Sequence, residues 1–448
     1  MSISPAPAGE QSGPSRARFT PRIPAILRLG GARLASNLRD PITVLPLILI
    51  GAFIARAIWL DLPQNALIFD EAYYVNAARI LLGLPVAAGA HYAGSPAGLD
   101  PNMEHPPLGK LIIAGSMLIF GDNGFGWRIP SLIAGMASLG TLYLIVRSAG
   151  ETAWLAVLAV AFVALDNLSL VHSRIGTLDM LVLAPILLGA WLALRERWAL
   201  AGVAIGIGFL IKLTALYGLL AVLILLGLTV LGVWRERRRI GLAELRPVVS
   251  LVLAFSVVAA GGLALLDARL TTFSSPIDHV RHMVQYGTAL KSPIEHAGIC
   301  TAADSAPWQW PFNECKITYL RVDVTVRSGD QLVAQYPKVD FVGALNPLLA
   351  STIPFAIFFT LWAAWRTGSR LAIWSIAWAA ANYLPYVLLA ILSQRITYIY
   401  YFLPVVPAVA VAVAILLLRS GLPRFVLWGF IAAYTVGFAA YFPFRQIP

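Results

Sequence analysis

The chain has 448 residues, of which 59% are hydrophobic and only 12% are charged. A soluble domain has about 45–50% apolar and about 25% charged residues, so this composition excludes an ordinary soluble domain and indicates a polytopic membrane protein. The formal net charge of +11 does not indicate nucleic-acid binding, because the arginines stand in short segments between apolar runs.

Residues 1–40, at the start of the chain, are rich in Pro, Ser, Gly and Arg, a composition that predicts a disordered basic tail. The first crossing helix is expected near 42–60. The apolar run Leu108–Phe120 is shorter than the roughly 20 residues that a crossing needs, so we expect it to lie at the membrane interface. Further crossing helices are expected near 129–147, 152–171, 179–195, 199–213, 214–234, 247–266, 346–365, 371–392, 402–419 and 424–442.

The fold expected from this pattern is an all-α transmembrane bundle of about eleven helices, with interfacial helices in the first outer loop. The short loops on one side are rich in arginine, and the positive-inside rule places that side and the N-terminus in the cytoplasm. These arginines are Arg147, Arg195, Arg197, Arg235, Arg237, Arg238, Arg239, Arg246, Arg366, Arg370, Arg419 and Arg424.

This topology divides the chain into three parts after the tail. The first is a transmembrane module at 41–266, which includes the first outer loop at 61–128 and is expected to carry the catalytic groups. A mixed extracytoplasmic loop follows at 267–345, and a C-terminal transmembrane module occupies 346–448.

Polar side chains in so apolar a chain are expected to line one cavity, because lipid does not tolerate them. The titratable residues of the outer segments include Asp70, Glu104, His105, Lys110, Asp179, Lys212 and Arg395. We expect them to converge on an outward-facing cavity. A divalent metal among Asp70, Glu104 and Asp179 is compatible with this set, but nothing in the pattern requires one.

Asp70 and Glu71 begin an amphipathic run that Gly83 closes. Asp70 is either the N-cap of that helix or a general base held at the membrane edge, and a cap can also fix the carboxylate for catalysis. The string from His105 to Lys110 starts the interfacial helix with two prolines. It predicts either a phosphate site at a helix N-terminus or a stiff corner with a lysine that reaches water.

The other cations of the outer segments also allow two interpretations. Arg174 can form an ordinary ion pair with Asp179, and Lys212 can simply reach the membrane surface. Arg395 precedes several tyrosines, and Arg and Tyr favour the interface. Alternatively, these cations hold a substrate phosphate.

Cys300 and Cys315 both lie in the loop at 267–345. Two thiols in one extracytoplasmic loop predict a disulfide, with free thiols as the alternative. The same loop carries Trp308, Trp310 and the run ITYLRVDVTV, which predicts a strand. We therefore expect this loop to be ordered and to lie over the cavity.

The strings FDEAYY, EHPPLGK, GWRIPS, SRIGTLDM, NPLL and YIYYFLP together resemble the protein O-mannosyltransferase family. This family belongs to the C-type glycosyltransferases, which use polyprenyl-phosphate sugars, and the order of the motifs is also similar to that of the lipid A aminoarabinose transferases. The resemblance is strongest over residues 42–240. It implies a C-type glycosyltransferase-like bundle in the cell membrane, with the active site on the extracytoplasmic side.

Matched positions imply roles for individual residues. The resemblance implies that Asp70 is the catalytic base and that Glu71 assists it. It also adds Arg128, which matches the family's arginine after the first loop. The residues expected to bind the donor phosphate are then His105, Lys110, Arg128, Arg174, Lys212 and Arg395.

The expected reaction is an inverting transfer of mannose from a polyprenyl-phosphate donor to Ser/Thr hydroxyls of exported proteins. Polyprenyl phosphate is a good leaving group, so a base and cations suffice and no cofactor is required. Transfer to a lipid or a glycan remains an alternative. A transporter of lipid-linked substrates is the rival from another class; the sequence shows no inverted repeat of broken helices, which disfavours it.

Overall fold

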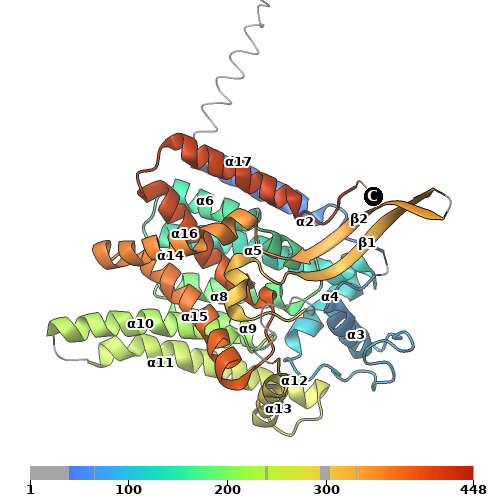
Figure 1. Ribbon diagram of the computed structural model, residues 1–448. Coiled ribbons are helices and arrows are strands. Elements are labelled where there is room, and N and C mark those ends of the chain that lie inside the picture. The colour runs from blue at the N-terminus through green and yellow to red at the C-terminus, as the bar shows by residue number, and fades with distance from the viewer. Residues whose placement is uncertain (1–39, 65, 238–240, 293–302, 329, 447–448) are drawn as a thin grey trace, which may run out of the picture.

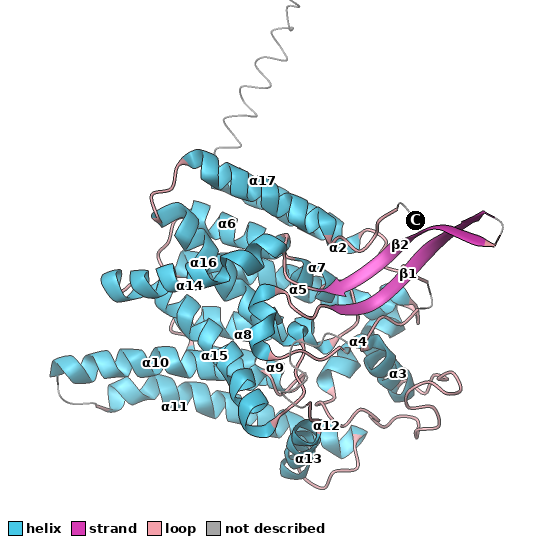
Figure 2. Ribbon diagram, viewed as in Figure 1, coloured by secondary structure: helices cyan, strands magenta, loops and turns pink. Residues whose placement is uncertain are grey.

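The computed structural model describes residues 40–64, 66–237, 241–292, 303–328 and 330–446, and these residues fold mainly into helices (Figures 1 and 2). The tail predicted for residues 1–40 lies almost wholly outside the described residues. The elements in chain order are α2 (Pro41–Ala57), α3 (Glu71–Leu81), α4 (Leu108–Phe120), α5 (Gly124–Ser148), α6 (Ala153–Ala164), α7 (Asn167–His172), α8 (Leu178–Leu194), α9 (Trp198–Phe209), α10 (Ala215–Arg237), α11 (Leu242–Ser256), η1 (Val257–Gly261), α12 (Gly262–Leu270), α13 (Pro276–Ala289), η3 (Pro307–Phe312), β1 (Ile317–Ser328), β2 (Gln331–Gly343), α14 (Pro347–Thr367), α15 (Arg370–Ser393), η4 (Ile399–Val405), α16 (Val406–Arg419) and α17 (Arg424–Ala440).

Each predicted crossing segment contains a helix, but the number of crossings stays a prediction. Within the described ranges, six helical stretches are long and apolar enough to cross a membrane by length and composition. They are Gly124–Ser148, Ala215–Glu236, Leu242–Leu270, Pro347–Thr367, Arg370–Ser393 and Ile399–Arg419. The other apolar helices, such as α2, α8 and α9, are shorter. The chain is therefore a multi-pass membrane protein built as a helical bundle.

The crossing predicted at 152–171 is not one continuous helix. α6 ends at Ala164, and Asp166 starts α7 by accepting a hydrogen bond from the backbone N–H of Ser169 at 2.9 Å. The other oxygen of this buried carboxylate accepts from the N–H of Asn346 at 2.8 Å, at the start of α14. The aspartate breaks the apolar run because it satisfies N–H groups that a helix terminus leaves free. α7 then packs against β2 and η4.

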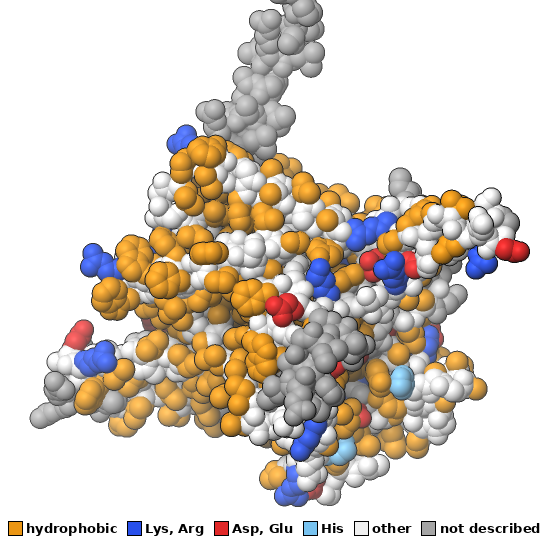
Figure 3. Space-filling view, in the orientation of Figure 1, with side chains coloured by type: hydrophobic (Ala, Val, Ile, Leu, Met, Phe, Trp, Pro, Cys, Tyr) orange, Lys and Arg blue, Asp and Glu red, His pale blue; other side chains and the backbone are white. Residues whose placement is uncertain are grey.

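Different elements lie at the two ends of the bundle, and a hydrophobic face lies between them. The last turn of α10 and the first turn of α11 lie at the opposite end of the molecule from β1 and β2 (Figure 1). Figure 3 shows a broad hydrophobic face over α14, α15 and α17, with Lys and Arg side chains at its ends. α16 lies inside the bundle, with residues Val406 to Ile415 all buried. A hydrophobic face of this extent fits contact with lipid.

β1 and β2 form an antiparallel hairpin, the only strands within the described residues, and confirm the strand predicted for ITYLRVDVTV. Ile317 pairs with Gly343 at its base, where Tyr319 is also buried. Val339 of β2 pairs with Phe444, so residues near the C-terminus lie along the other edge of β2. The base of the hairpin is thus fixed to the bundle, while its tip projects from the body (Figure 1).

Candidate active site

A cavity of about 410 Å³ lies where several segments of the fold meet. They are the start of α3, the loop before α4, the junction of α9 and α10, α13, the end of α15, and the segment that leads into α16. The polar and aromatic side chains of its wall are Asp70, Tyr73, Tyr74, Asn102, Glu104, His105, Lys212, Thr214, Tyr217, Tyr286, Thr288, Tyr386, Arg395, Tyr398, Tyr400 and Tyr401. Five of the predicted titratable residues are therefore brought together in one cavity.

Asp70 stands at the N-cap position of α3, but its side chain makes no capping hydrogen bond. Its backbone is already helical, with φ of −67° and ψ of −5°, whereas a capping aspartate has extended dihedral angles. No hydrogen bond or ion pair joins its carboxylate to another described residue, so the capping interpretation is wrong and the carboxylate is left to the cavity. Burial raises the pKa of Asp70 to about 7, while the Lys212 charge lowers it and the Asp179 charge raises it further.

Lys212 reaches the cavity from the short segment between α9 and α10. Its Nζ donates to Oδ1 of Asp179 at 2.7 Å, and both side chains are less than one-tenth exposed. The ammonium also lies 5.6 Å and 5.8 Å from the ring centroids of Tyr400 and Tyr401, within the range of a cation–π contact. Asp179 therefore pairs with Lys212 and not with Arg174, and the Lys212 side chain is buried in the protein.

Arg395 follows the C-cap of α15, where Gln394 has a φ of 51°. The Arg395 side chain lines the cavity, and its Nη1 is buried without a hydrogen-bond partner among the described residues. A buried guanidinium N–H without a partner is costly, so it marks a place where a ligand oxygen is expected.

Glu71 and Arg128 do not line this cavity; they form a fully buried ion pair behind it. The Arg128 guanidinium donates to both Glu71 oxygens, at 2.8 and 2.9 Å, and to the carbonyls of Leu60, Leu62 and Ala66. All five N–H donors of Arg128 are thus used. Arg128 therefore has no donor left for a phosphate, while the position of Glu71 next to Asp70 fits the assisting role expected for it.

Arg174 is also buried, and its guanidinium donates to the carbonyls of Ala55, Ile58 and Trp59 at the end of α2. These carbonyls are free because a helix end leaves them without partners. Arg174 therefore closes the end of α2, and the structure does not place it on the cavity as predicted.

Lys110 points away from the cavity into the loop that precedes α4. Its Nζ lies 2.6 Å from Oδ2 of Asp100, with both side chains fully buried, and donates to the carbonyls of Asn102 and His105. The lysine sits in the first turn of α4 because a buried carboxylate and two carbonyls compensate its charge. Its expected role in binding the phosphate is thus replaced by a role in shaping this loop.

The loop that Lys110 holds carries two predicted residues into the cavity. Glu104 lines the wall and accepts a hydrogen bond from Nδ2 of Asn102 at 2.8 Å. His105 lies beside the Tyr74 ring, 5.9 Å between centroids. Burial lowers the pKa of His105 well below its ordinary value, and the charges of Lys212, Lys110 and Arg395 lower it further. His105 is therefore neutral near pH 7 and can contact a phosphate only as a hydrogen-bond donor.

Within the described part of the chain, no three His, Cys, Asp or Glu side chains are close enough to hold a metal ion. The group of Asp70, Glu104 and Asp179 is therefore not assembled, since Asp179 already pairs with Lys212. Cys315 is buried beneath Gln309. Cys300 lies outside the described residues, so the disulfide stays a prediction.

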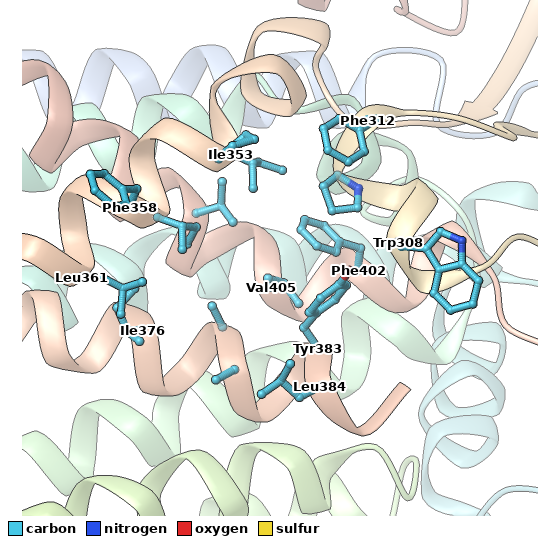
Figure 4. A pocket seen from close by; sticks show the side chains of 16 residues that line it. Trp308, Phe312, Ile353, Phe358, Leu361, Ile376, Tyr383, Leu384, Phe402 and Val405 are labelled. Carbon is cyan, nitrogen blue, oxygen red and sulfur yellow. The ribbon is translucent and has the colours of Figure 1, made fainter. Parts of the chain in front are cut away.

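A second cavity, of about 520 Å³, lies between α14 and α15 under η3 (Figure 4). Apolar side chains such as Phe358, Leu361 and Val405 line it, and its only titratable lining residue is Tyr383. A wall without acids or cations cannot activate a hydroxyl or hold a phosphate. The first cavity is therefore the candidate active site.

Sequence reasoning missed some residues of the site. Asp100, which neutralises Lys110, stands in a loop without any periodic pattern. Tyr286 lines the cavity from α13, one turn after the buried Met283. The amphipathic spacing of His279, Met283 and Tyr286 was a signal for this helix, although not for its place at the cavity.

Comparison with known proteins gives a consistent result. Residues 104–260 match the family model described as dolichyl-phosphate-mannose-protein mannosyltransferase. A polyprenol-phosphate-mannose–protein mannosyltransferase of Mycobacterium tuberculosis is 34% identical over 113 residues, which are 25% of this chain and only 20% of that protein. The protein of the same name from Corynebacterium glutamicum is 24% identical over 417 residues, covering 78% of this chain and 76% of that protein.

The fold is also found among solved structures. The S. cerevisiae protein O-mannosyltransferase Pmt1-Pmt2 complex bound to the sugar donor matches with a TM-score of 0.63 and 12% sequence identity, covering 92% of this chain and 91% of that chain. The helical bundle thus has the same fold as this membrane mannosyltransferase. Through residues 104–260 and the longer alignment with the Corynebacterium glutamicum protein, the chain is similar to the protein mannosyltransferases.

Proposed function

We propose that this protein transfers mannose from a polyprenyl-phosphate donor to Ser/Thr hydroxyls of exported proteins. One observation carries the proposal: the Asp70 carboxylate, without a partner among the described residues, shares a cavity with Lys212 and Arg395. A base and two cations are what the displacement of a lipid-linked phosphate requires. The names of the relatives from Mycobacterium tuberculosis and Corynebacterium glutamicum support mannose as the sugar and protein as the acceptor.

In the proposed reaction, the Asp70 carboxylate takes the proton of the acceptor hydroxyl while that oxygen attacks the anomeric carbon. The bond from this carbon to the phosphate oxygen breaks, so the anomeric configuration inverts in a single displacement. Lys212 and Arg395 bind the phosphate as it departs. Because the phosphate leaves as a stable anion, the step needs no general acid and no cofactor.

Apolar side chains in the cavity wall are consistent with a lipid-linked donor. Leu213, just before α10, Leu216, in its first turn, and Leu389, near the end of α15, line the same cavity as the cations. A polyprenyl chain placed between these helices lies against apolar side chains while its phosphate meets Lys212 and Arg395. Asp179 fixes the position of Lys212 through their ion pair.

The proposed site of action is the outer face of the cell membrane. The cavity is lined from α3, α13 and the end of α15. The last turns of α10 and α14, whose sequences include Arg235 and Arg366, lie at the opposite end of the bundle from β1 and β2 (Figure 1). The positive-inside rule supports a cytoplasmic position for the arginine-rich end and an outer position for the cavity.

Reconstituted protein tests the proposal directly. It is incubated with radiolabelled polyprenyl-phosphate mannose and peptides that carry Ser or Thr, and the products are examined by mass and by anomeric configuration. We expect a covalent mannosyl peptide with inverted configuration. Label that appears only in a lipid or glycan contradicts the protein acceptor, and label that crosses the membrane without a covalent product supports a transporter.

A further inference from the structure

Phe69, the residue before Asp70, has an unusual backbone conformation. Its φ is 56°, in the left-handed region that bulky residues rarely adopt. Such a conformation persists only where surrounding contacts hold it, and it sets the direction in which the next residue leaves the chain. The contacts of the Phe69 ring therefore determine where Asp70 points.

The Phe69 ring packs against an aromatic group from distant parts of the chain. It stacks on Tyr319 of β1, with 4.3 Å between centroids and an angle of 30°. It also meets the edge of Tyr400, a residue of the cavity wall, at 5.4 Å. Tyr319 is thus the stacking partner of Phe69, and it comes from the base of the hairpin.

Tyr319 is itself fixed from two sides. Its hydroxyl and Nε2 of His172 share a hydrogen bond of 3.0 Å, and Nδ1 of His172 lies 3.2 Å from the hydroxyl of Thr177. On the other side, Gly343 of β2 leaves room for the ring. A Cβ added at Gly343 would lie 2.3 Å from the Tyr319 hydroxyl oxygen and 2.5 Å from its Cζ. A side chain at Gly343 is therefore incompatible with this position of Tyr319.

The residue after Asp70 is held equally firmly. The Glu71 carboxylate accepts hydrogen bonds from the backbone N–H groups of Ile68 and Gly176, each at 2.7 Å, besides its ion pair with Arg128. Asp70 therefore stands between two anchored neighbours while its own carboxylate has no described partner. The contacts of the two neighbours thus fix the position of the Asp70 carboxylate, and its oxygens stay free to accept a proton.

We infer that Tyr319 is a positioning residue for Asp70: the base of the β1–β2 hairpin holds Phe69 in its left-handed conformation and thereby aims the Asp70 carboxylate into the cavity. The inference rests on the proposed function, because it takes Asp70 as the base. By this inference, the base of the hairpin contributes to catalysis although the hairpin is not part of the helical bundle. Tyr319 acts through Phe69 and does not touch the cavity itself.

Two variants of Tyr319 separate positioning from general stability. Tyr319→Phe keeps the stacked ring and loses only the hydrogen bond to His172, whereas Tyr319→Leu also loses the ring. We expect Tyr319→Leu to lower kcat by about 10–100-fold, the usual effect of a small displacement of a catalytic group. The KM for the donor should stay within about twofold, because Lys212 and Arg395 are unchanged. Tyr319→Phe should retain most of the activity.

Gly343→Ala provides a second route that does not depend on how well Tyr319→Leu folds. In the wild-type background the new methyl group collides with the Tyr319 ring, so kcat should fall. In the Tyr319→Leu background the colliding atoms are gone, so Gly343→Ala should lower kcat no further. Equal effects of Gly343→Ala in both backgrounds, or a donor KM that rises as much as kcat falls, would overturn the inference. Wild-type protein assayed alongside shows whether mannosyl transfer itself occurs, and this tests the proposed function separately.

Discussion

The Nζ of Lys212 and Oδ1 of Asp179 lie 2.7 Å apart at the wall of the cavity that contains the Asp70 carboxylate. This ion pair keeps a cation beside the site while no acid or cation is bonded to Asp70 within the described part of the chain. The base and the phosphate-binding groups are therefore separate, and they can be removed one at a time.

Removing the cations should weaken donor binding. Lys212→Met and Arg395→Met each delete a charge that faces the phosphate, so each should cost about 1.5–3 kcal/mol of donor binding, as expected for a lost charged hydrogen bond. Binding of a polyprenyl phosphate to purified protein measures this. Arg281→Met is a matched control, because this arginine of α13 has a side chain that is 65% exposed. Unchanged affinity in both cavity variants would exclude these residues from the phosphate site.

Lys212→Met also leaves Asp179 buried without its partner, and this must be separated from the loss of the cation. The double variant Lys212→Met/Asp179→Asn removes both charges and so avoids an unpaired buried carboxylate. It should regain thermal stability relative to Lys212→Met but still bind the donor weakly. Recovery of full donor affinity in the double variant would show that the lysine only neutralises Asp179.

Lys110 should matter for stability more than for donor affinity. Lys110→Met leaves the Asp100 carboxylate buried without its partner at 2.6 Å, and breaking a buried ion pair from one side costs about 3–5 kcal/mol. We expect a lower thermal midpoint, partly restored in Lys110→Met/Asp100→Asn, with near-normal donor affinity in the folded protein. A normal midpoint with weakened donor binding would instead return Lys110 to the phosphate site.

The outline of the fold and the location of the site could be predicted because they depend on local patterns. Apolar runs mark the helices, and Asp70 and Arg395 stand out as charges in an apolar chain. The destination of a buried arginine cannot be predicted in this way. Arg128 binds carbonyls at residues 60–66, and Arg174 binds carbonyls at the end of α2. Whether such an arginine is free to bind a phosphate therefore depends on which distant helix end or loop packs against it.

The role of Asp70 could not be decided from the sequence either. A carboxylate before an amphipathic helix fits a cap and a base equally well by sequence. The choice depends on Phe69, whose left-handed backbone and stacking on Tyr319 turn the chain before α3. A contact between residues so far apart in the chain leaves no periodic signal, so only the structure separates the two interpretations.

The pH dependence of turnover should reflect the burial of Asp70. As a base, Asp70 must be ionised, so activity is present above its pKa and is lost as the pH falls through it. Since burial raises that pKa from 3.8 to about 7, the acidic limb of kcat/KM should lie near neutral pH. Measuring kcat/KM from about pH 5 to about pH 9 tests this. A profile that stays flat down to about pH 5 would contradict the raised pKa or the role of Asp70.

Topology can be tested in cells with reporters at two described positions. A reporter inserted after Thr367, in the link between α14 and α15, should be cytoplasmic because arginines flank this link. A reporter inserted after Ser328, at the hairpin tip, should be extracytoplasmic. Both reporters on one side of the membrane would contradict the proposed placement of the cavity.

The replacement of Asp70 by asparagine tests the central claim most directly. Asp70→Asn keeps the size of the side chain and removes its basicity, and no described hydrogen bond is lost. If Asp70 is the base, turnover should fall by about 10²–10⁴-fold while donor affinity changes little. Single-turnover transfer from radiolabelled donor, with binding measured on the same preparation, gives both values. Transfer at the wild-type rate by folded Asp70→Asn protein would contradict the account.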